Sequence, residues 1–257
     1  MILLLLALAA AADPTHKAHE VATALPFAHN AYLELRRAAA AITDPALRAA
    51  VEVQLTVVVA ADGKHGDFLA APGGPCEDGH HGYPGGLSVH SLALLQHARG
   101  LAATYRHVYG IDVQDDWLVA AAIWHDSLKS VTLPWREDGS CGPESNIAGT
   151  PAHHVLGVAS AINRHLPGEL VYVIAAAHGV DRACEWMQAA SMMVRGEKGS
   201  CPQKPPVEAF IVHFADSDYA LTGLAWKRYV EKAPKGWERY DALKADGNDV
   251  LLFSRSW

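Results

Sequence analysis

An adjacent histidine and aspartate, His125 and Asp126, follow the apolar run WLVAAAIW and are the residues best suited to metal chemistry. Burying such a pair at the end of an apolar helix is costly without a compensating partner. A divalent cation is a suitable partner, because histidine offers a nitrogen ligand and aspartate an oxygen ligand. Further polar side chains stand within or at the end of other apolar runs: His90, His154, His178 and Asp216. Helices of a bundle can bring such side chains together, so the set predicts a site for one ion, or for two ions bridged by a carboxylate.

The elements that must position these residues are expected to be helices almost throughout. Apolar residues recur with helical spacing in seven runs: 25–42, 43–61, 84–110, 115–128, 150–166, 167–179 and 205–223. The β-branched end of the second run, 51–61, could also be a strand, but it continues a helix that opens with a cap and Pro45, so helix is favoured. A Gly/Pro-rich loop is expected at 62–82, and Gly-rich insertions near 136–150 and 180–205. The sequence therefore predicts an all-α single domain with Gly/Pro-rich loop insertions.

Composition limits the partners of the chain. The 257 residues suffice for one large domain, and the 50% of apolar residues suffice for a core. The formal net charge of −7 disfavours a stable complex with long nucleic acid. A small anionic substrate remains compatible with this charge if a metal supplies positive charge. The oligomeric state stays open.

The first twelve residues, MILLLLALAAAA, are uncharged and apolar. They are too short to span a bilayer, so no membrane span is expected. Residues 1–12 resemble the apolar region of a signal peptide that ends in small residues before Asp13, although the usual basic residues are missing. We expect export to the periplasm or secretion. The alternative is a cytoplasmic protein with a misassigned start or an apolar N-terminal helix.

Four cysteines stand far apart, without a CxxC pair that would indicate structural zinc: Cys76, Cys141, Cys184 and Cys201. In an exported protein they would form up to two disulfides, for which three pairings are possible. In a cytoplasmic protein they would be free thiols.

Five strings carry a resemblance to a known superfamily: HHGYPGGLSVHSLAL, AAAIWHDSLK, GTPAHHVLG, AAAHG and PPVEAFIVHFADSDYAL. Their order H, HD, H, H, D resembles the HD-domain superfamily of metal-dependent phosphohydrolases, and the strings resemble the HD domain of bacterial 3′–5′ exoribonucleases. The resemblance runs from about residue 42 to about residue 225. It implies an all-α HD-domain bundle over residues 42–230, after a helical extension at 13–41 and before a tail at 231–257.

The resemblance also implies roles for the matching residues. The implied metal ligands are His90, His125, Asp126, His154, His178 and Asp216. The implied reaction is hydrolysis of a phosphate ester, such as a nucleotide or a short oligonucleotide, by water activated by one or two divalent ions of manganese, iron, nickel, cobalt or zinc. Asp126 would bridge two ions, and Lys129, which matches the lysine of an HD-x-x-K motif, would meet a phosphate oxygen. Three histidines flank the motifs and are expected to contact substrate: His80, His81 and His153.

The chain departs from the exoribonuclease pattern at three points. The oligonucleotide-binding β-domain of those enzymes has no counterpart in residues 13–41, which makes long RNA an unexpected substrate. Ala177 stands where that family tends to have a first histidine before His178. The coordination of a second metal ion is therefore expected to differ from that family. Asp218 stands one position earlier than the second acidic residue of the last motif.

Two other functions use the same ligands. The mixed-valent diiron oxygenases of the HD superfamily also have a single histidine in the fourth motif, so an oxygenase acting on a small polar substrate is the alternative. A non-enzymatic metal sensor is less favoured, because every expected ligand and Lys129 are present.

Overall fold

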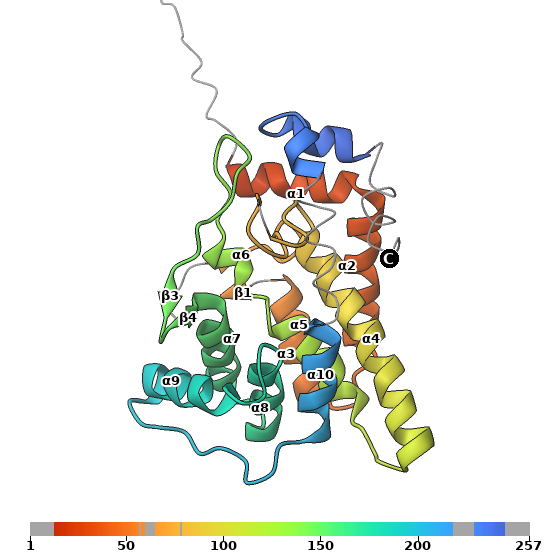
Figure 1. Ribbon diagram of the computed structural model, residues 1–257, viewed down its shortest axis with the longest axis vertical. Helices are drawn as coiled ribbons and strands as arrows, with labels where there is room; N and C mark the ends of the chain where they lie inside the picture. Colours follow the sequence, from red (N-terminus) through yellow and green to blue (C-terminus); the bar gives the residue numbers. More distant parts are fainter. Residues whose placement is uncertain (1–12, 57, 60–64, 78, 218–228, 245–257) are drawn as a thin grey trace, which may run out of the picture.

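The computed structural model describes residues 13–56, 58–59, 65–77, 79–217 and 229–244. Over these residues the chain is a helical bundle with two short antiparallel hairpins, which confirms the predicted all-α class (Figure 1). The helices are α1 Pro14–Ala24, α2 Pro26–Ala40, α3 Pro45–Thr56, α4 Gly86–Tyr109, α5 Asp115–Trp124, α6 Lys129–Thr132, α7 Ala152–Asn163, α8 Gly168–Ala176, α9 Ala183–Arg195 and α10 Val207–Ser217. The strands are β1 Val58–Val59, β2 His65–Gly66, β3 Asn146–Ile147 and β4 Thr150–Pro151.

Local sequence signals explain where the first helices begin. Proline occupies the first helical position of α1, α2 and α3, where its missing N–H costs no hydrogen bond. The Asp13 carboxylate caps α1 by accepting a hydrogen bond from the Thr15 N–H at 3.1 Å. The Asp44 carboxylate caps α3 in the same way, accepting from Ala46 at 2.8 Å.

The helix α5 runs through the centre of the main core. Its residues from Leu118 to Trp124 are all buried, and it packs against α3, α4, α8 and α10. The Trp124 indole N–H donates to the Gly157 carbonyl of α7 at 3.1 Å. Because a helix that is buried on every side lies inside the protein, the residues directly after it begin in the interior. His125 and Asp126 follow Trp124, so the fold places them at the middle of the bundle.

Two expectations about secondary structure are wrong. The helix expected over 43–61 ends at Thr56, and Val58–Val59 pairs with His65–Gly66 as a short hairpin, in keeping with the β-preference of a valine run. The insertion expected over 180–205 contains the helix α9, whose apolar face is buried and whose end is marked by Gly196 at φ 74°. The insertion near 136–150 is irregular until the β3–β4 hairpin, as expected.

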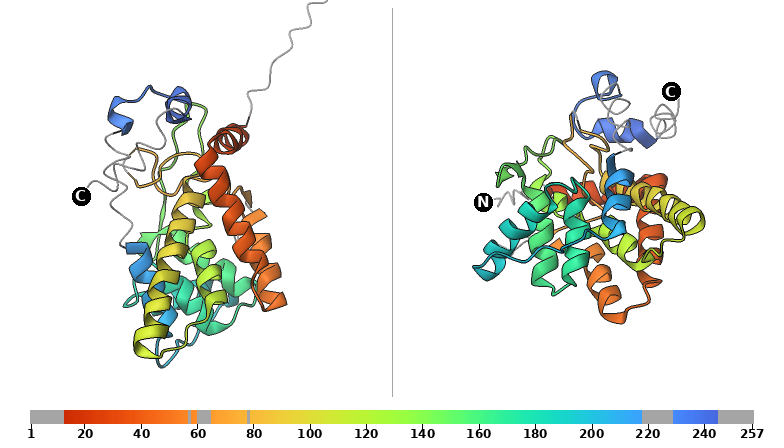
Figure 2. Two further views of the ribbon diagram at one scale, coloured as in Figure 1. Left: turned by 90° about the vertical axis from the view of Figure 1, so that its right-hand side faces the viewer. Right: turned by 60° about the horizontal axis from the view of Figure 1, so that its bottom comes forward.

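A second, smaller core lies at one end of the bundle, where residues 229–244 pack beside α1 (Figures 1 and 2). Tyr240 is fully buried there, and its hydroxyl donates to the Gly139 carbonyl at 2.9 Å. The expected extension at 13–41 shares the main core through Leu35 and Ala39 of α2. The division of the chain at residue 42 and at residue 230 stays a prediction.

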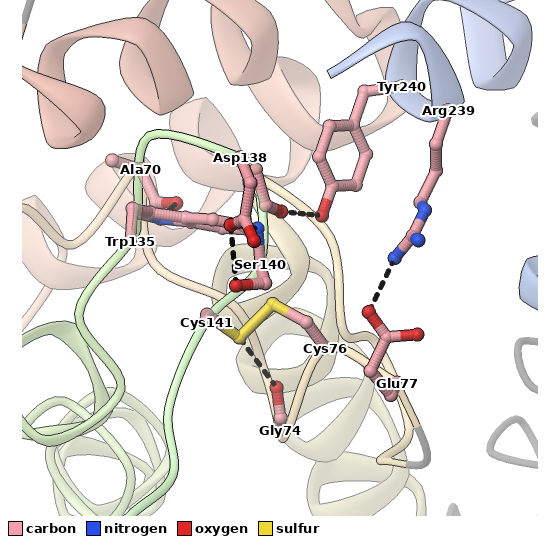
Figure 3. Close-up of a disulfide and its surroundings, with 11 residues drawn as sticks. Ala70, Gly74, Cys76, Glu77, Trp135, Asp138, Ser140, Cys141, Arg239 and Tyr240 are labelled. Carbon is pink, nitrogen blue, oxygen red and sulfur yellow. Dashed lines mark hydrogen bonds and ion pairs between the residues drawn. A yellow bond between two sulfur atoms is a disulfide. The ribbon is translucent and has the colours of Figure 1, made fainter. Parts of the chain in front are cut away.

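The four cysteines form two disulfides, Cys76–Cys141 and Cys184–Cys201. The first joins the Gly/Pro-rich loop before α4 to the loop after α6, beside Trp135 and Tyr240 (Figure 3). The Trp135 indole N–H donates to the Ala70 carbonyl at 2.9 Å and adds a second link between these loops. Residues 1–12, predicted to be a signal peptide, lie outside the described residues. No described helix combines the length and apolar character needed to cross a membrane.

Candidate metal centre

The predicted ligands come from five parts of the bundle and meet beside the end of α5. His90 lies on α4, His125 and Asp126 follow α5, His178 follows α8, and Asp216 lies on α10. His153 and His154 both lie in the first turn of α7. The polar atoms of these side chains form two groups that share Asp126.

The first group consists of His90, His125, Asp126 and Asp216. The Nε2 atom of His90 lies 3.1 Å from Nε2 of His125, 3.2 Å from Oδ2 of Asp126 and 3.1 Å from Oδ1 of Asp216. Neighbouring ligand atoms about 2.0–2.2 Å from one ion, at octahedral or tetrahedral angles, are themselves about 2.8–3.6 Å apart. Because one ligand atom each of His90, His125 and Asp126 lie within 4.8 Å of one another, these three residues fit a divalent transition-metal ion, and Asp216 is a further carboxylate beside His90 and His125.

The ring of His125 is oriented by the helix that precedes it. Its Nδ1 atom lies 3.2 Å from the Ala121 carbonyl and 3.1 Å from the Ala122 carbonyl. Carbonyl oxygens only accept, so Nδ1 carries the proton in these hydrogen bonds. The Nε2 atom then faces the first group and is the nitrogen available to a metal.

The second group faces the other oxygen of Asp126. Oδ1 of Asp126 lies 3.1 Å from Nε2 of His153 and 3.4 Å from Nε2 of His178. Nδ1 of His178 lies 3.5 Å from Oδ2 of Asp216. One Asp126 oxygen therefore faces each group.

The two neighbouring histidines of α7 have different surroundings. His154 was predicted as a ligand and His153 as a substrate contact. The His154 ring stacks on His178 at 3.8 Å, and its Nδ1 atom lies 2.5 Å from the Thr150 hydroxyl. Ligand atoms of His153, His154 and His178 all lie within 4.8 Å of one another. The structure thus adds His153, which faces Asp126 directly, to the candidate ligands.

Lys129 is buried against the same centre. Its Nζ atom donates to Oδ2 of Asp126 and to the Gly73 carbonyl, each at 2.6 Å. The ammonium neutralises the buried carboxylate and ties the Gly-rich loop to it. The phosphate contact expected of Lys129 stays a prediction.

His80 and His81 are carried to the first group by the Gly-rich loop. The His80 ring lies 4.9 Å from the His90 ring, and the Nδ1 atoms of His80 and His81 lie 3.1 Å apart. His81 has the left-handed φ of 53°, and its carbonyl accepts from Gly73 at 2.9 Å. A Cβ on Gly86 would lie 1.9 Å from that carbonyl, so glycine is required for this close approach.

Opposite charges outweigh desolvation in the first group. Burial alone would raise the pKa of Asp126, but the charges of Lys129 and His125 hold it well below its usual range. Burial alone would lower the pKa of His125, but its charge interaction and hydrogen bond with Asp126 raise it to about 10, aided by Asp216. The carboxylates of the centre thus favour positive charge between them, and a bound metal ion would supply such a charge.

His80 gives a pH-dependent prediction for metal-free protein. Burial, followed by the charges of His90 and Lys129, lowers the pKa of His80 from 6.5 to about 3. Between these values the unfolded chain binds the proton and the folded chain does not, so this histidine makes stability fall as the pH drops from 6.5 toward 3. We expect His80→Gln to lose less of its free energy of unfolding over this range than the wild type, measured by urea denaturation with chelator present. Parallel curves for the two proteins would contradict this.

Comparison with known proteins finds one informative relative. No family model matches the chain, and no solved structure matches it. The chain is 30% identical over 138 residues to a dihydroneopterin 2′,3′-cyclic phosphate phosphodiesterase of Methanocaldococcus jannaschii. The match covers 53% of this chain and 47% of the relative, so it spans about half of each protein. A buried His/Asp centre and similarity to a phosphodiesterase thus occur in the same chain.

Proposed function

We propose that this protein is an HD-type, divalent-metal-dependent phosphodiesterase that hydrolyses a small phosphodiester. The observation that carries the proposal is Asp126, whose two oxygens face two separate groups of nitrogen and oxygen ligands. Two ions bridged by one carboxylate are a common arrangement for phosphoryl hydrolysis. Similarity to a phosphodiesterase supports this reaction over oxygenation.

The proposed ligands divide between two metal positions. His90, His125 and Asp216 would hold the first ion together with Oδ2 of Asp126. His153 and His178 would hold the second ion with Oδ1 of Asp126, and His154 is a further candidate beside them. The mixed nitrogen and oxygen ligands suit manganese, iron, cobalt, nickel or zinc. When bound, such ions lower the pKa of water and stabilise negative charge on phosphate.

The remaining residues would orient the ligands and line the site. Lys129 holds Oδ2 of Asp126 in place, and its remaining N–H is suited to a phosphate oxygen. His80 and His81 lie beside His90 on the Gly-rich loop. Because burial keeps His80 neutral at neutral pH, it would contact a substrate through a hydrogen bond rather than through charge.

The proposed substrate is a small cyclic phosphodiester. The relative acts, by its name, on a 2′,3′-cyclic phosphate. A net charge of −7 disfavours a stable complex with long nucleic acid, so a short oligonucleotide is the largest polymer we propose. The first substrate to test is therefore the 2′,3′-cyclic phosphate of a nucleoside-like compound.

The function is tested by hydrolysis after metal exchange. Protein stripped with chelator and reloaded anaerobically with manganese or iron(II) is assayed on bis-p-nitrophenyl phosphate and on 2′,3′-cyclic nucleotides. We expect metal-dependent hydrolysis of both substrates, with the cyclic nucleotides opened to a phosphomonoester. No turnover of any phosphodiester, despite two irons bound per chain, would contradict the hydrolase and favour the diiron oxygenase.

We also propose that the protein is exported. The proposal is supported by the two disulfides, which persist in oxidising compartments. Mass spectrometry of protein expressed from Met1 in a bacterial host with a periplasm is expected to give a mature chain that begins at Asp13. An unprocessed chain with four free thiols would contradict export.

A further inference from the structure

Glu144 makes two hydrogen bonds to a single residue of the second ligand group. Its Oε1 atom accepts from the backbone N–H of His153 at 2.8 Å and lies 2.7 Å from the Nδ1 atom of the same histidine. The Glu144 side chain is only 11% exposed. Because Oε1 accepts from the backbone N–H of His153, it is also placed to accept from the Nδ1–H of the same residue.

A carboxylate at Nδ1 decides which nitrogen of His153 can bind a metal. Because Oε1 accepts, Nδ1 carries the proton, and the lone pair of the neutral ring is on Nε2. Nε2 is the atom that lies 3.1 Å from Oδ1 of Asp126. Glu144 thus fixes both the tautomer and the direction of the His153 ring.

We propose that Glu144 is a positioning residue that sets the affinity of the second metal position, an inference that rests on the proposed function. A carboxylate that accepts from a metal-bound histidine fixes the ring and makes it a stronger donor. Loss of such a partner typically weakens metal binding about 10- to 100-fold. Glu144 touches neither the proposed ion nor substrate and acts through His153.

The loop that carries Glu144 is held on both sides. Cys141 anchors it through the disulfide to Cys76 (Figure 3). On the other side, the Ala152 N–H donates to the Ser145 carbonyl at 2.9 Å, next to the β3–β4 hairpin. An irregular loop fastened in this way can hold one carboxylate in a constant position at the start of α7.

The first metal position is oriented in a different way. The Nδ1 atom of His125 donates to main-chain carbonyls of α5, which no side-chain substitution removes. Replacement of Glu144 should therefore weaken binding of the second ion and leave binding of the first ion unaffected. Replacement of a residue that only supported the fold would weaken binding of both ions.

The test compares Glu144→Gln with Glu137→Gln, an exposed residue of the same loop whose replacement removes the same charge. The two binding constants for manganese are measured by calorimetry on chelator-stripped protein, beside the melting temperature. Glutamine has nearly the shape of glutamate but is neutral, and its amide can also turn an N–H toward Nδ1. We expect Glu144→Gln to weaken the second binding step about 10- to 100-fold, with the first step and Glu137→Gln at wild-type values.

Two results would overturn the inference. One is wild-type affinity for both ions in Glu144→Gln, and the other is an equal loss at both steps together with a lower melting temperature. The measurement needs no substrate. Two-ion binding with the expected selective loss would therefore support the role of Glu144 even if no phosphodiester were hydrolysed, which would overturn only the proposed reaction.

Discussion

Replacing Asp126 with asparagine is expected to lower kcat/KM for phosphodiester hydrolysis by roughly a thousandfold or more, about 4 kcal/mol of transition-state stabilisation. Asp126 faces both ligand groups at short distance, with Oδ2 3.2 Å from Nε2 of His90 and Oδ1 3.1 Å from Nε2 of His153. An amide carries no charge and turns an N–H toward one of the two groups. Both proposed ions should therefore be lost together.

The same substitution changes stability, and this must be separated from its effect on activity. Lys129 is buried and paired with Asp126 at 2.6 Å, so Asp126→Asn leaves an uncompensated ammonium. Breaking one side of a buried pair costs about 3–5 kcal/mol. The combined variant Asp126→Asn with Lys129→Met should recover part of this stability without recovering activity.

The control for charge is Asp241→Asn, which removes an exposed carboxylate from a pair with Lys244. It should keep wild-type activity and ion content. Metal content is measured by mass spectrometry of the metals and activity on bis-p-nitrophenyl phosphate. Folded Asp126→Asn protein that retains both ions and more than about a tenth of the activity would contradict the bridging role.

Removing the disulfide Cys76–Cys141 with two serines is expected to cost roughly 4 kcal/mol of unfolding free energy, because it closes a loop with a sequence separation of 65 residues. For a chain of this length, the melting temperature should fall by roughly 10 °C. We also expect weaker metal binding, because one half of the disulfide lies in the loop of His80 and the other in the loop of Glu144. Stability and site geometry would change together.

The other disulfide provides a matched control. Cys184–Cys201 joins the first turn of α9 to the segment after it, across a sequence separation of 17 residues, and its removal should cost roughly 3 kcal/mol. It joins neither the His80 loop nor the Glu144 loop. The serine variant of this pair should melt earlier and still bind two ions. Full metal affinity without Cys76–Cys141, or equal loss of ions in both variants, would contradict the link between the first disulfide and the site.

The meeting of the ligands could be predicted from the sequence because each ligand breaks an apolar helical run. His90, His125 and Asp216 stand among residues that a helix must bury, so their polar atoms need partners inside the bundle. The structure brings these side chains within 3.1–3.6 Å of one another. The spacing of apolar residues shows which face of a helix is buried. A polar side chain on that face must then point into the bundle.

Contacts made by irregular segments could not be predicted in this way. Glu144 lies in a loop without periodicity, and no sequence signal points from it to His153. The pairing of Cys76 with Cys141 was one of three possibilities. The sequence pattern does not reveal α9, because Gly179 before it and Gly196, Gly199 and Ser200 after it suggest one long loop.

The neighbouring histidines of α7 show a limit of motif matching. His153 and His154 are adjacent. If a short motif is aligned one residue earlier, the roles expected for the two histidines are exchanged. On a helix, neighbours point about 100° apart, and only one of them can face Asp126 directly. The structure gives this position to His153, at 3.1 Å.

The most direct test of the two-ion phosphodiesterase is a titration of activity with metal. Chelator-stripped wild-type protein receives manganese in increments under anaerobic conditions, and hydrolysis of a 2′,3′-cyclic nucleotide is followed at each step. We predict no activity in stripped protein and a plateau when two ions are bound per chain. Full activity without metal, or no activity with both positions filled, would contradict this prediction.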